Sequence, residues 1–235
     1  MKDRVAVITG ATGSLGTVVS KRLAAEGSRL VLTGTNVGRL ESLAGELGLP
    51  PDRVLTGVFN FVEPRAAGLA AQLVLEKFGR VDVLLHLVGG WTGGKPVVDV
   101  PPSDLANMLD QHVWTTFYLA QAFVRPLVAN KWGRIIVVSS PLATNPPANM
   151  APYVVGKAAE EALVLTVAKE VARTGVTANI LQVRTIDAKH ERDREPTPKN
   201  ANWTTPEEIA SAIVYLCSDD AHVINGARLP LYGVT

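Results

Sequence analysis

The sequence of 235 residues contains one cysteine and four histidines, and its charges nearly cancel. The single cysteine, Cys217, excludes an intramolecular disulfide framework and a cysteine-rich zinc site. The histidines form no HxH or HxxxH pair, so we expect no metal site. With 23 basic and 22 acidic side chains the net charge is +1, which is too little for a protein that neutralises nucleic-acid phosphates.

Long apolar runs are also missing. No apolar stretch reaches the roughly 20 residues that a helix needs to span a bilayer, so we expect no membrane association. A strand-like segment begins within the first few residues and leaves no room for a signal peptide. These absences favour a protein of the cytoplasm.

The sequence does contain a regular alternation of apolar runs with longer segments of helical periodicity. Six runs predict strands, at residues 5–9, 29–33, 54–59, 81–88, 134–139 and 176–183. Most are apolar almost throughout, which is typical of strands covered on both faces. The segments between and after them predict helices, at residues 14–26, 37–47, 64–78, 104–130, 152–174 and 206–218. We therefore expect an α/β fold with a three-layer, doubly wound parallel sheet of Rossmann type, as a single domain spanning residues 1–235.

Two of the predicted helices, at residues 104–130 and 152–174, carry more apolar surface than one face of a sheet can cover. The excess indicates either a thick core or a subunit interface. We favour the interface, in a homodimer or homotetramer, because large apolar surfaces are normally hidden from water.

One stretch interrupts the alternation. Residues 188–200 crowd charges of both signs together with two prolines, a composition that predicts a mobile surface loop. Beyond the carboxyl end of a strand such a loop is either an ordinary connection or a lid over a substrate. We take residues 188–204 as the candidate lid.

Glycines follow the first predicted strand, in the segment Thr9-Gly10-Ala11-Thr12-Gly13-Ser14-Leu15-Gly16. Glycines between a strand and a helix allow a tight turn, and the helix N-terminus offers free N–H groups to a pyrophosphate. The triplet alone is weak evidence, but its place at the first strand–helix junction of an α/β chain points to dinucleotide binding.

Tyr153 and Lys157 are four residues apart at the start of a predicted helix, so they share one face. An ammonium beside a phenol favours the phenolate, which makes Tyr153 a candidate general acid and base. Ser140 ends the preceding strand 13 positions before Tyr153, where its hydroxyl can polarise a carbonyl.

In order and spacing, the glycine segment, Ser140, Tyr153 and Lys157 resemble the short-chain dehydrogenase/reductase superfamily, and the resemblance covers essentially the whole chain. It implies an NAD(P)-dependent oxidoreductase in which the cofactor supplies the hydride. Tyr153 would exchange the proton with a carbonyl or alcohol substrate, Lys157 would assist it and hold the nicotinamide ribose, and Ser140 would orient the substrate oxygen. The residues expected at the cofactor, besides Tyr153 and Lys157, are Gly10, Thr12, Ser14, Leu15, Gly16, Thr35, Asn36, Asn60, Phe61, Val88, Gly89, Gly90, Arg184 and Ile186.

The chain departs from the family pattern at several places. The substitutions are Ser14 for a glycine of the loop, His86 and Leu87 for two asparagines, His112 for a helix asparagine, and Val183-Arg184 for Pro-Gly. His112, which we count among the candidate catalytic residues, either relays a proton or is a buried structural side chain. Arg184 either reaches the cofactor phosphates or caps the strand. The departures leave an alternative open, a dinucleotide-binding or sensing protein with weak or lost catalysis.

The segments around Gly89-Gly90-Trp91, His112 and Trp203 look like the dihydropteridine reductase branch of the superfamily. By this likeness Trp91 would lie against a flat, pterin-like substrate, with plain packing as the alternative. Ser140 opposes a full match, because that branch lacks the serine.

The cofactor preference depends on the residues after the second strand. A carboxylate there would bind the ribose 2′-hydroxyl of NAD, but the chain has Thr35 and Asn36. Thr35, Asn36 and Arg39 can hold a 2′-phosphate, so we expect NADP to be preferred over NAD. Asn60 takes the place of an aspartate beside the adenine.

Overall fold

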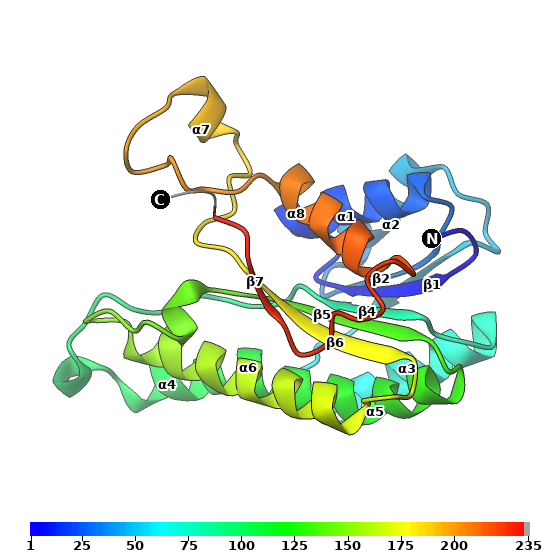
Figure 1. Ribbon diagram of the computed structural model, residues 1–235, viewed down its shortest axis with the longest axis horizontal. Coiled ribbons are helices and arrows are strands. Elements are labelled where there is room, and N and C mark those ends of the chain that lie inside the picture. The colour runs from blue at the N-terminus through cyan, green and yellow to red at the C-terminus, as the bar shows by residue number, and fades with distance from the viewer. Residues whose placement is uncertain (233–235) are drawn as a thin grey trace.

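A computed structural model describes residues 1–232, in which one parallel sheet is covered by helices on both faces (Figure 1). The strands are β1 (Val5–Thr9), β2 (Arg29–Gly34), β3 (Val54–Val58), β4 (Val83–His86), β5 (Gly133–Ser139), β6 (Val176–Gln182) and β7 (Arg228–Pro230). Their order in the sheet is β3-β2-β1-β4-β5-β6-β7. The predicted α/β class, the doubly wound parallel sheet and the single domain are confirmed. The predicted domain span extends to residues 233–235, outside the described residues.

Two layers of helices bury the two faces of this sheet. One face is covered by α1 (Ser14–Ala25), α2 (Val37–Leu47) and α8 (Pro206–Leu216). The other is covered by α3 (Ala66–Phe78), α5 (Thr115–Ala129) and α6 (Ala151–Glu170) (Figure 1). Each face has its own apolar core, because the strand side chains alternate between the faces and are buried on both. No helix in residues 1–232 is long and apolar enough to cross a membrane.

The single helix predicted at residues 104–130 is interrupted in the structure. It consists of α4 (Pro102–Met108), a π-helical segment η2 (Leu109–Trp114) and α5. A π turn accommodates one extra residue, and such turns are frequent at functional sites. Here the turn contains His112, whose side chain is fully buried. Apolar periodicity does not reveal a π turn, because the pattern on either side of it remains helical.

The predicted set of strands also needs correction in two places. The strand predicted at residues 81–88 is limited to β4, because the chain leaves the sheet after His86 and continues as a loop. The edge strand β7 was not predicted, since its three residues are largely exposed and form no apolar run.

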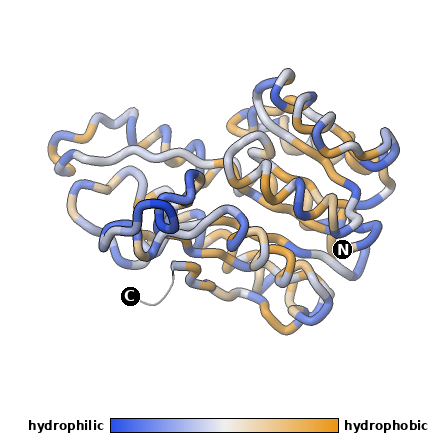
Figure 2. The backbone as a smooth tube through the Cα atoms, turned by 90° about the horizontal axis from the view of Figure 1, so that it is seen from above, coloured by the Kyte–Doolittle hydropathy of each residue, from blue (hydrophilic) through white to orange (hydrophobic). Residues whose placement is uncertain are grey.

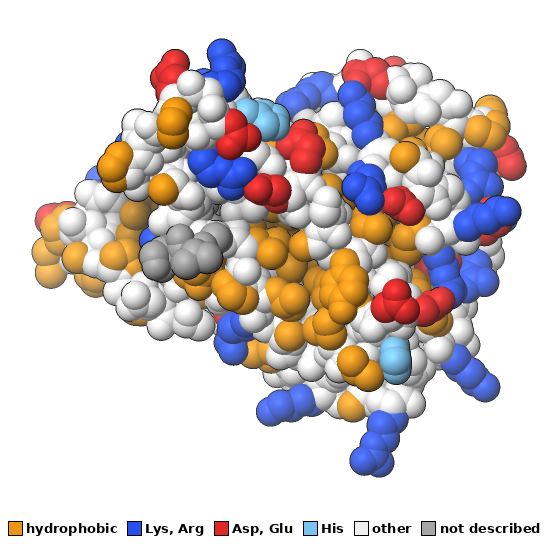
Figure 3. Space-filling view, turned by 45° about the horizontal axis from the view of Figure 1, so that its top comes forward, with side chains coloured by type: hydrophobic (Ala, Val, Ile, Leu, Met, Phe, Trp, Pro, Cys, Tyr) orange, Lys and Arg blue, Asp and Glu red, His pale blue; other side chains and the backbone are white. Residues whose placement is uncertain are grey.

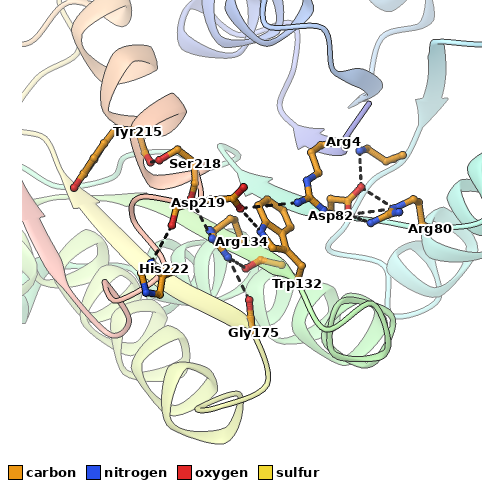
Figure 4. A network of polar contacts seen from close by, with 12 residues as sticks. Arg4, Arg80, Asp82, Trp132, Arg134, Gly175, Tyr215, Ser218, Asp219 and His222 are labelled. Atoms are coloured by element: carbon orange, nitrogen blue, oxygen red, sulfur yellow. Dashed lines mark hydrogen bonds and ion pairs between the residues drawn. The ribbon is translucent and has the colours of Figure 1, made fainter. Parts of the chain in front are cut away.

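The amino ends of the strands are joined by a network of polar contacts (Figure 4). The ring of Trp132 lies between the guanidinium groups of Arg4 and Arg134, whose central carbons are 3.7 and 4.3 Å from its centroid. The indole N–H of Trp132 donates to Asp219 at 2.7 Å, and buried Asp82 accepts from the Val5 N–H at 2.8 Å. This edge of the sheet is therefore filled by structural contacts.

The opposite edge, at the carboxyl ends of the strands, is where a ligand site is expected. β1 lies between β2 and β4, so the chain leaves β1 and β4 toward opposite faces of the sheet. The loops after these two strands diverge and leave a crevice between them.

Candidate active site

A continuous cleft occupies this crevice. It consists of two cavities, of about 330 and 530 Å³, which share residues of the loops after β1 and β4. The shared residues are Gly10, Gly13, Leu87, Val88 and Gly89. A bipartite cleft astride two such loops suits an elongated ligand such as a dinucleotide.

Most of the predicted site residues line this cleft. The smaller cavity is lined by Gly10, Ser14, Leu15, Gly16, Val88, Gly89, Gly90, Trp91, His112, Tyr153, Lys157, Arg184 and Ile186. The larger cavity adds Thr12, Thr35, Asn60 and Phe61. Asn36 and Ser140 line neither cavity among the described residues.

The glycine loop after β1 forms one wall and fits a diphosphate. Gly13 is the N-cap of α1 and no side chain caps the helix, so the first N–H groups of α1 are free for an anion. A Cβ atom on Gly16 would lie 2.2 Å from the Gly10 carbonyl oxygen, so the loop and the helix approach more closely than any other residue allows. Gly10 has a positive φ of 66°, which turns the chain sharply after the strand.

Tyr153 and Lys157 lie at the other end of the smaller cavity, in the first two turns of α6. The Tyr153 ring is half-buried and makes an edge-to-face contact with His112, with centroids 5.8 Å apart. The Lys157 side chain is buried, and its ammonium donates to the Val138 carbonyl at 2.8 Å and to Glu160 at 2.7 Å. These two bonds leave one N–H of the ammonium for a ligand in the cleft.

His112 closes the cleft beside Tyr153. Its Nε2 is 3.0 Å from the Gly90 carbonyl oxygen, which can only accept, so Nε2 carries the proton and Nδ1 is an acceptor. Burial, with a further contribution from the Lys157 ammonium, lowers the pKa of His112 to about 3. The ring is therefore neutral near pH 7, and its buried Nδ1 makes no hydrogen bond.

Ser140 is buried, and its hydroxyl oxygen accepts a hydrogen bond from the Leu142 N–H at 3.3 Å, which caps a short 3-10 turn, η3 (Pro141–Ala143). Its neighbour Ser139 lines the smaller cavity and has a buried hydroxyl without a partner. The role of Ser140 toward a substrate stays a prediction, and Ser139 is a second hydroxyl at that wall which sequence spacing did not indicate.

The larger cavity ends beside the start of α2. Asn36 is the N-cap of this helix, and its side chain accepts from the Arg39 N–H at 2.9 Å, which explains its absence from the cavity wall. The Arg39 guanidinium extends over the cavity and donates to the Thr12 carbonyl at 2.5 Å. A cation, a hydroxyl from Thr35 and a helix N-terminus thus meet at this end.

The candidate lid contains a short helix, α7 (Glu191–Arg194), and is strongly hydrophilic (Figure 2). The carboxylate of Asp187 accepts the N–H groups of Glu191 and Arg192 at 2.8 and 2.9 Å. Arg192 also pairs with both oxygens of Glu208 in α8, at 3.1 and 2.8 Å. On the surface over α7 and α8, acidic and basic side chains lie close together (Figure 3). The segment, predicted to be an unpacked mobile loop, is therefore tied to α8 by charged contacts.

The structure also places residues near the site that sequence reasoning did not single out. Glu160 lies one turn beyond Lys157 and has no exposed surface, and Gln111 lines the larger cavity beside Gly90. The spacing of Glu160 from Lys157 on the predicted helix was a usable signal, since residues three apart share a face. No group of three His, Cys, Asp or Glu side chains within residues 1–232 is arranged to hold a metal ion.

Comparison with known proteins gives consistent matches over the whole chain. A family model described as short chain dehydrogenase matches residues 4–199. The chain is 31% identical to a 1,6-dihydroxycyclohexa-2,4-diene-1-carboxylate dehydrogenase of Pseudomonas putida, over 99% of this chain and 92% of that protein. It is 27% identical to a 3-oxoacyl-acyl-carrier-protein reductase of Vibrio cholerae, over 99% and 97% of the two chains. The crystal structure of NAD+-bound xylitol dehydrogenase matches with a TM-score of 0.88 at 25% identity, covering 99% of both chains.

Proposed function

Because the chain belongs to the short-chain dehydrogenase family and is an oxidoreductase of that family, we propose that it transfers a hydride between a nicotinamide dinucleotide and a carbonyl or alcohol substrate. Tyr153 is the proton donor and acceptor in this proposal. The observation that carries it is a single cleft that begins at the glycine loop of α1 and ends at Tyr153 and Lys157.

Different groups along the cleft bind different parts of the cofactor and the substrate. The free N–H groups at the start of α1 bind the diphosphate, and the remaining N–H of Lys157 binds the nicotinamide ribose. When bound, the cofactor supplies or accepts the hydride. In the reducing direction the Tyr153 hydroxyl donates its proton to the substrate oxygen, and the phenolate that remains is stabilised by the Lys157 ammonium and reprotonated from solvent.

The proposal is tested by following NADPH and NADH absorbance with the purified protein and a panel of carbonyl compounds. The names of the relatives suggest the panel, namely a 3-oxoacyl thioester and a polyol–ketose pair, to which we add a quinonoid dihydropterin. We expect at least one compound to oxidise the reduced cofactor. A folded protein that binds either cofactor and turns over none of the panel would contradict the proposal.

The pterin-like substrate is a second candidate, favoured by Trp91. Its indole is 58% exposed at the mouth of the smaller cavity, in a glycine-rich loop, where it offers a flat face to a planar ring. Selective turnover of the dihydropterin, lost in Trp91→Ala, supports this candidate over an aliphatic carbonyl substrate.

We propose that the cofactor is NADP, on the basis of the larger cavity. Its far end has Arg39 and Thr35 and no carboxylate among the lining residues, so a 2′-phosphate meets a cation and a hydroxyl and no like charge. We expect Arg39→Ala to weaken NADPH binding about tenfold, as for loss of a hydrogen bond to a charged phosphate, and to leave NADH binding within about twofold, as measured by fluorescence titration. Equal losses for both cofactors, or tighter binding of NADH by the original protein, would refute this preference.

The outer surface of α5 and α6 supports the proposed homodimer or homotetramer. An apolar cavity of about 490 Å³ opens between these helices, lined among others by Phe117, Val124, Leu163 and Val167. Such a surface is normally covered in solution. We expect a light-scattering mass of about two or four times the 25.0 kDa of one chain, whereas a monomer at micromolar concentration would argue against an interface. A cytoplasmic location stays a prediction.

A further inference from the structure

Glu160 is a fully buried carboxylate behind the catalytic cleft. It follows Lys157 by one turn of α6, and its Oε2 is 2.7 Å from the Lys157 ammonium. Its Oε1 lies 3.4 Å from the Thr116 hydroxyl of α5, whose proton is donated to the His112 carbonyl at 2.6 Å. Burying a carboxylate costs free energy unless the carboxylate is paired with a positive charge. The ion pair between Glu160 and Lys157 therefore needs an explanation.

Two histidine rings flank the carboxylate from other elements. The Nε2 of His86 in β4 and the Nδ1 of His112 in η2 each lie 3.9 Å from a Glu160 oxygen. Burial, followed by the Lys157 charge, lowers the pKa of both rings to about 3, so both are neutral near pH 7. Burial raises the pKa of the Glu160 carboxyl above its ordinary value, and the Lys157 ammonium opposes that rise. The neighbouring acid of α6, Glu161, pairs with Arg228 at 2.5 Å, and its charge adds to the rise in the pKa of Glu160.

The hydrogen bonds of His86 show why it contributes no charge. The Thr115 hydroxyl donates to the Gln111 carbonyl at 2.7 Å, so its oxygen accepts from the His86 Nε2–H at 3.3 Å. His86 Nδ1 is then an acceptor for the Thr9 hydroxyl at 2.9 Å. With this ring and His112 both neutral, Lys157 is the one cation beside Glu160 within the described part of the chain, and Glu160 is its counter-charge.

The carboxylate therefore binds the ammonium that, in the proposed function, acts on Tyr153. We propose that Glu160 is a positioning residue of the reaction, which anchors the Lys157 ammonium and moderates the positive charge that it presents to Tyr153. The inference rests on the proposed function and adds to it a negative charge, the Glu160 carboxylate, in contact with the Lys157 ammonium. Since an ammonium favours the phenolate, a carboxylate on that ammonium favours the neutral phenol, which carbonyl reduction requires.

Glu160→Gln is the decisive substitution, because an amide keeps the shape and one acceptor for Lys157 while it removes the charge. We expect Tyr153 to ionise at a lower pH in E160Q, by up to about one unit, because the Lys157 charge is then no longer offset by a carboxylate. The alkaline limb of the kcat profile for carbonyl reduction moves down with it, and a shift of one unit lowers the rate on that limb about tenfold. KM for the cofactor stays within about threefold, because Lys157 remains in place.

Glu161→Gln is the matched control. Glu161 is the next residue, is equally buried, and accepts from Gln182 and Arg228, with no contact to Lys157. E161Q is expected to lower stability and to leave the pH profile unchanged. Glu160→Asp keeps the charge and withdraws it by one methylene, so a smaller shift in the same direction is expected.

The ionisation of Tyr153 is measured directly by ultraviolet difference titration of each protein against its own Tyr153→Phe derivative, which isolates one phenol and needs no turnover. A lower ionisation pH in E160Q, and not in E161Q, supports the proposal even if no substrate is found. An unchanged ionisation pH in both E160Q and E160D overturns it. If the unmodified protein shows no hydride transfer, that result counts against the proposed function and not against the role of Glu160.

Discussion

Replacement of Tyr153 by phenylalanine is expected to lower kcat about a thousandfold and to leave cofactor affinity within about threefold. Among the described residues that line the smaller cavity, Tyr153 supplies the one phenol, and the buried Lys157 lines the same cavity. General acid–base catalysis by a positioned group contributes about 10²–10⁴-fold, and phenylalanine removes only the hydroxyl. The ring contact with His112 is retained, so the fold of the cleft is preserved.

The control for this substitution is Tyr215→Phe, a tyrosine that is exposed on α8 and lines neither cavity of the cleft. It is expected to keep full activity. Steady-state kinetics with the best substrate of the panel, together with NADPH titration, measure both quantities. A Tyr153→Phe protein with more than about a tenth of the original kcat would show that another group supplies the proton.

Replacement of Gly16 by alanine is expected to abolish measurable cofactor binding and to lower the free energy of unfolding by about 2–3 kcal/mol. The new Cβ would lie 2.2 Å from the Gly10 carbonyl oxygen and 2.8 Å from two backbone atoms of Ala11. These neighbours are backbone atoms, which cannot relieve the clash by a change of side-chain rotamer. The loop must therefore move off α1, and the N–H groups that fit the diphosphate lose their alignment.

Gly45→Ala provides the comparison within the same protein. Gly45 lies in α2, and a Cβ there meets no atom within 4 Å. Alanine favours the helix by about 0.5–1 kcal/mol, so this variant should be slightly more stable and bind the cofactor normally. Chemical denaturation and fluorescence titration of both variants check the prediction, and a Gly16→Ala protein that binds NADPH normally would contradict it.

Sequence patterns were sufficient for the parts of the fold that depend on local rules. The glycine segment after Val5–Thr9 and the shared helix face of Tyr153 and Lys157 follow from local spacing, and the resemblance to the family placed them at one site. Both line the cleft. The alternation of apolar runs with helical segments likewise predicted the parallel sheet, because burial on both faces leaves continuous apolar strands.

The features that sequence reasoning missed depend on contacts between distant elements. The π turn around His112 accommodates one extra residue without disturbing the helical pattern on either side. The surroundings of Glu160 come from β4, η2 and α5, so only the folded chain shows that a carboxylate faces Lys157. Asn36 was assigned to the cofactor by its position, but its local role as an N-cap explains why it lies off the cavity wall.

The alternative of a binding or sensing protein differs from the enzyme in one testable respect. Both bind the dinucleotide through the same glycine loop, but only the enzyme needs a proton donor held beside an ammonium. The cleft contains the glycine loop together with a phenol, Tyr153, and an ammonium, Lys157, which favours the enzyme.

The most direct test of the central claim is isotope transfer from NADPH that carries deuterium at both hydrogen positions of the nicotinamide C4. The product of the best carbonyl substrate is analysed by mass spectrometry, with Tyr153→Phe as the parallel sample. We expect one deuterium on the carbon that was the carbonyl carbon, and almost no product from Tyr153→Phe. A product without deuterium, or equal labelled product from both proteins, would contradict hydride transfer assisted by Tyr153.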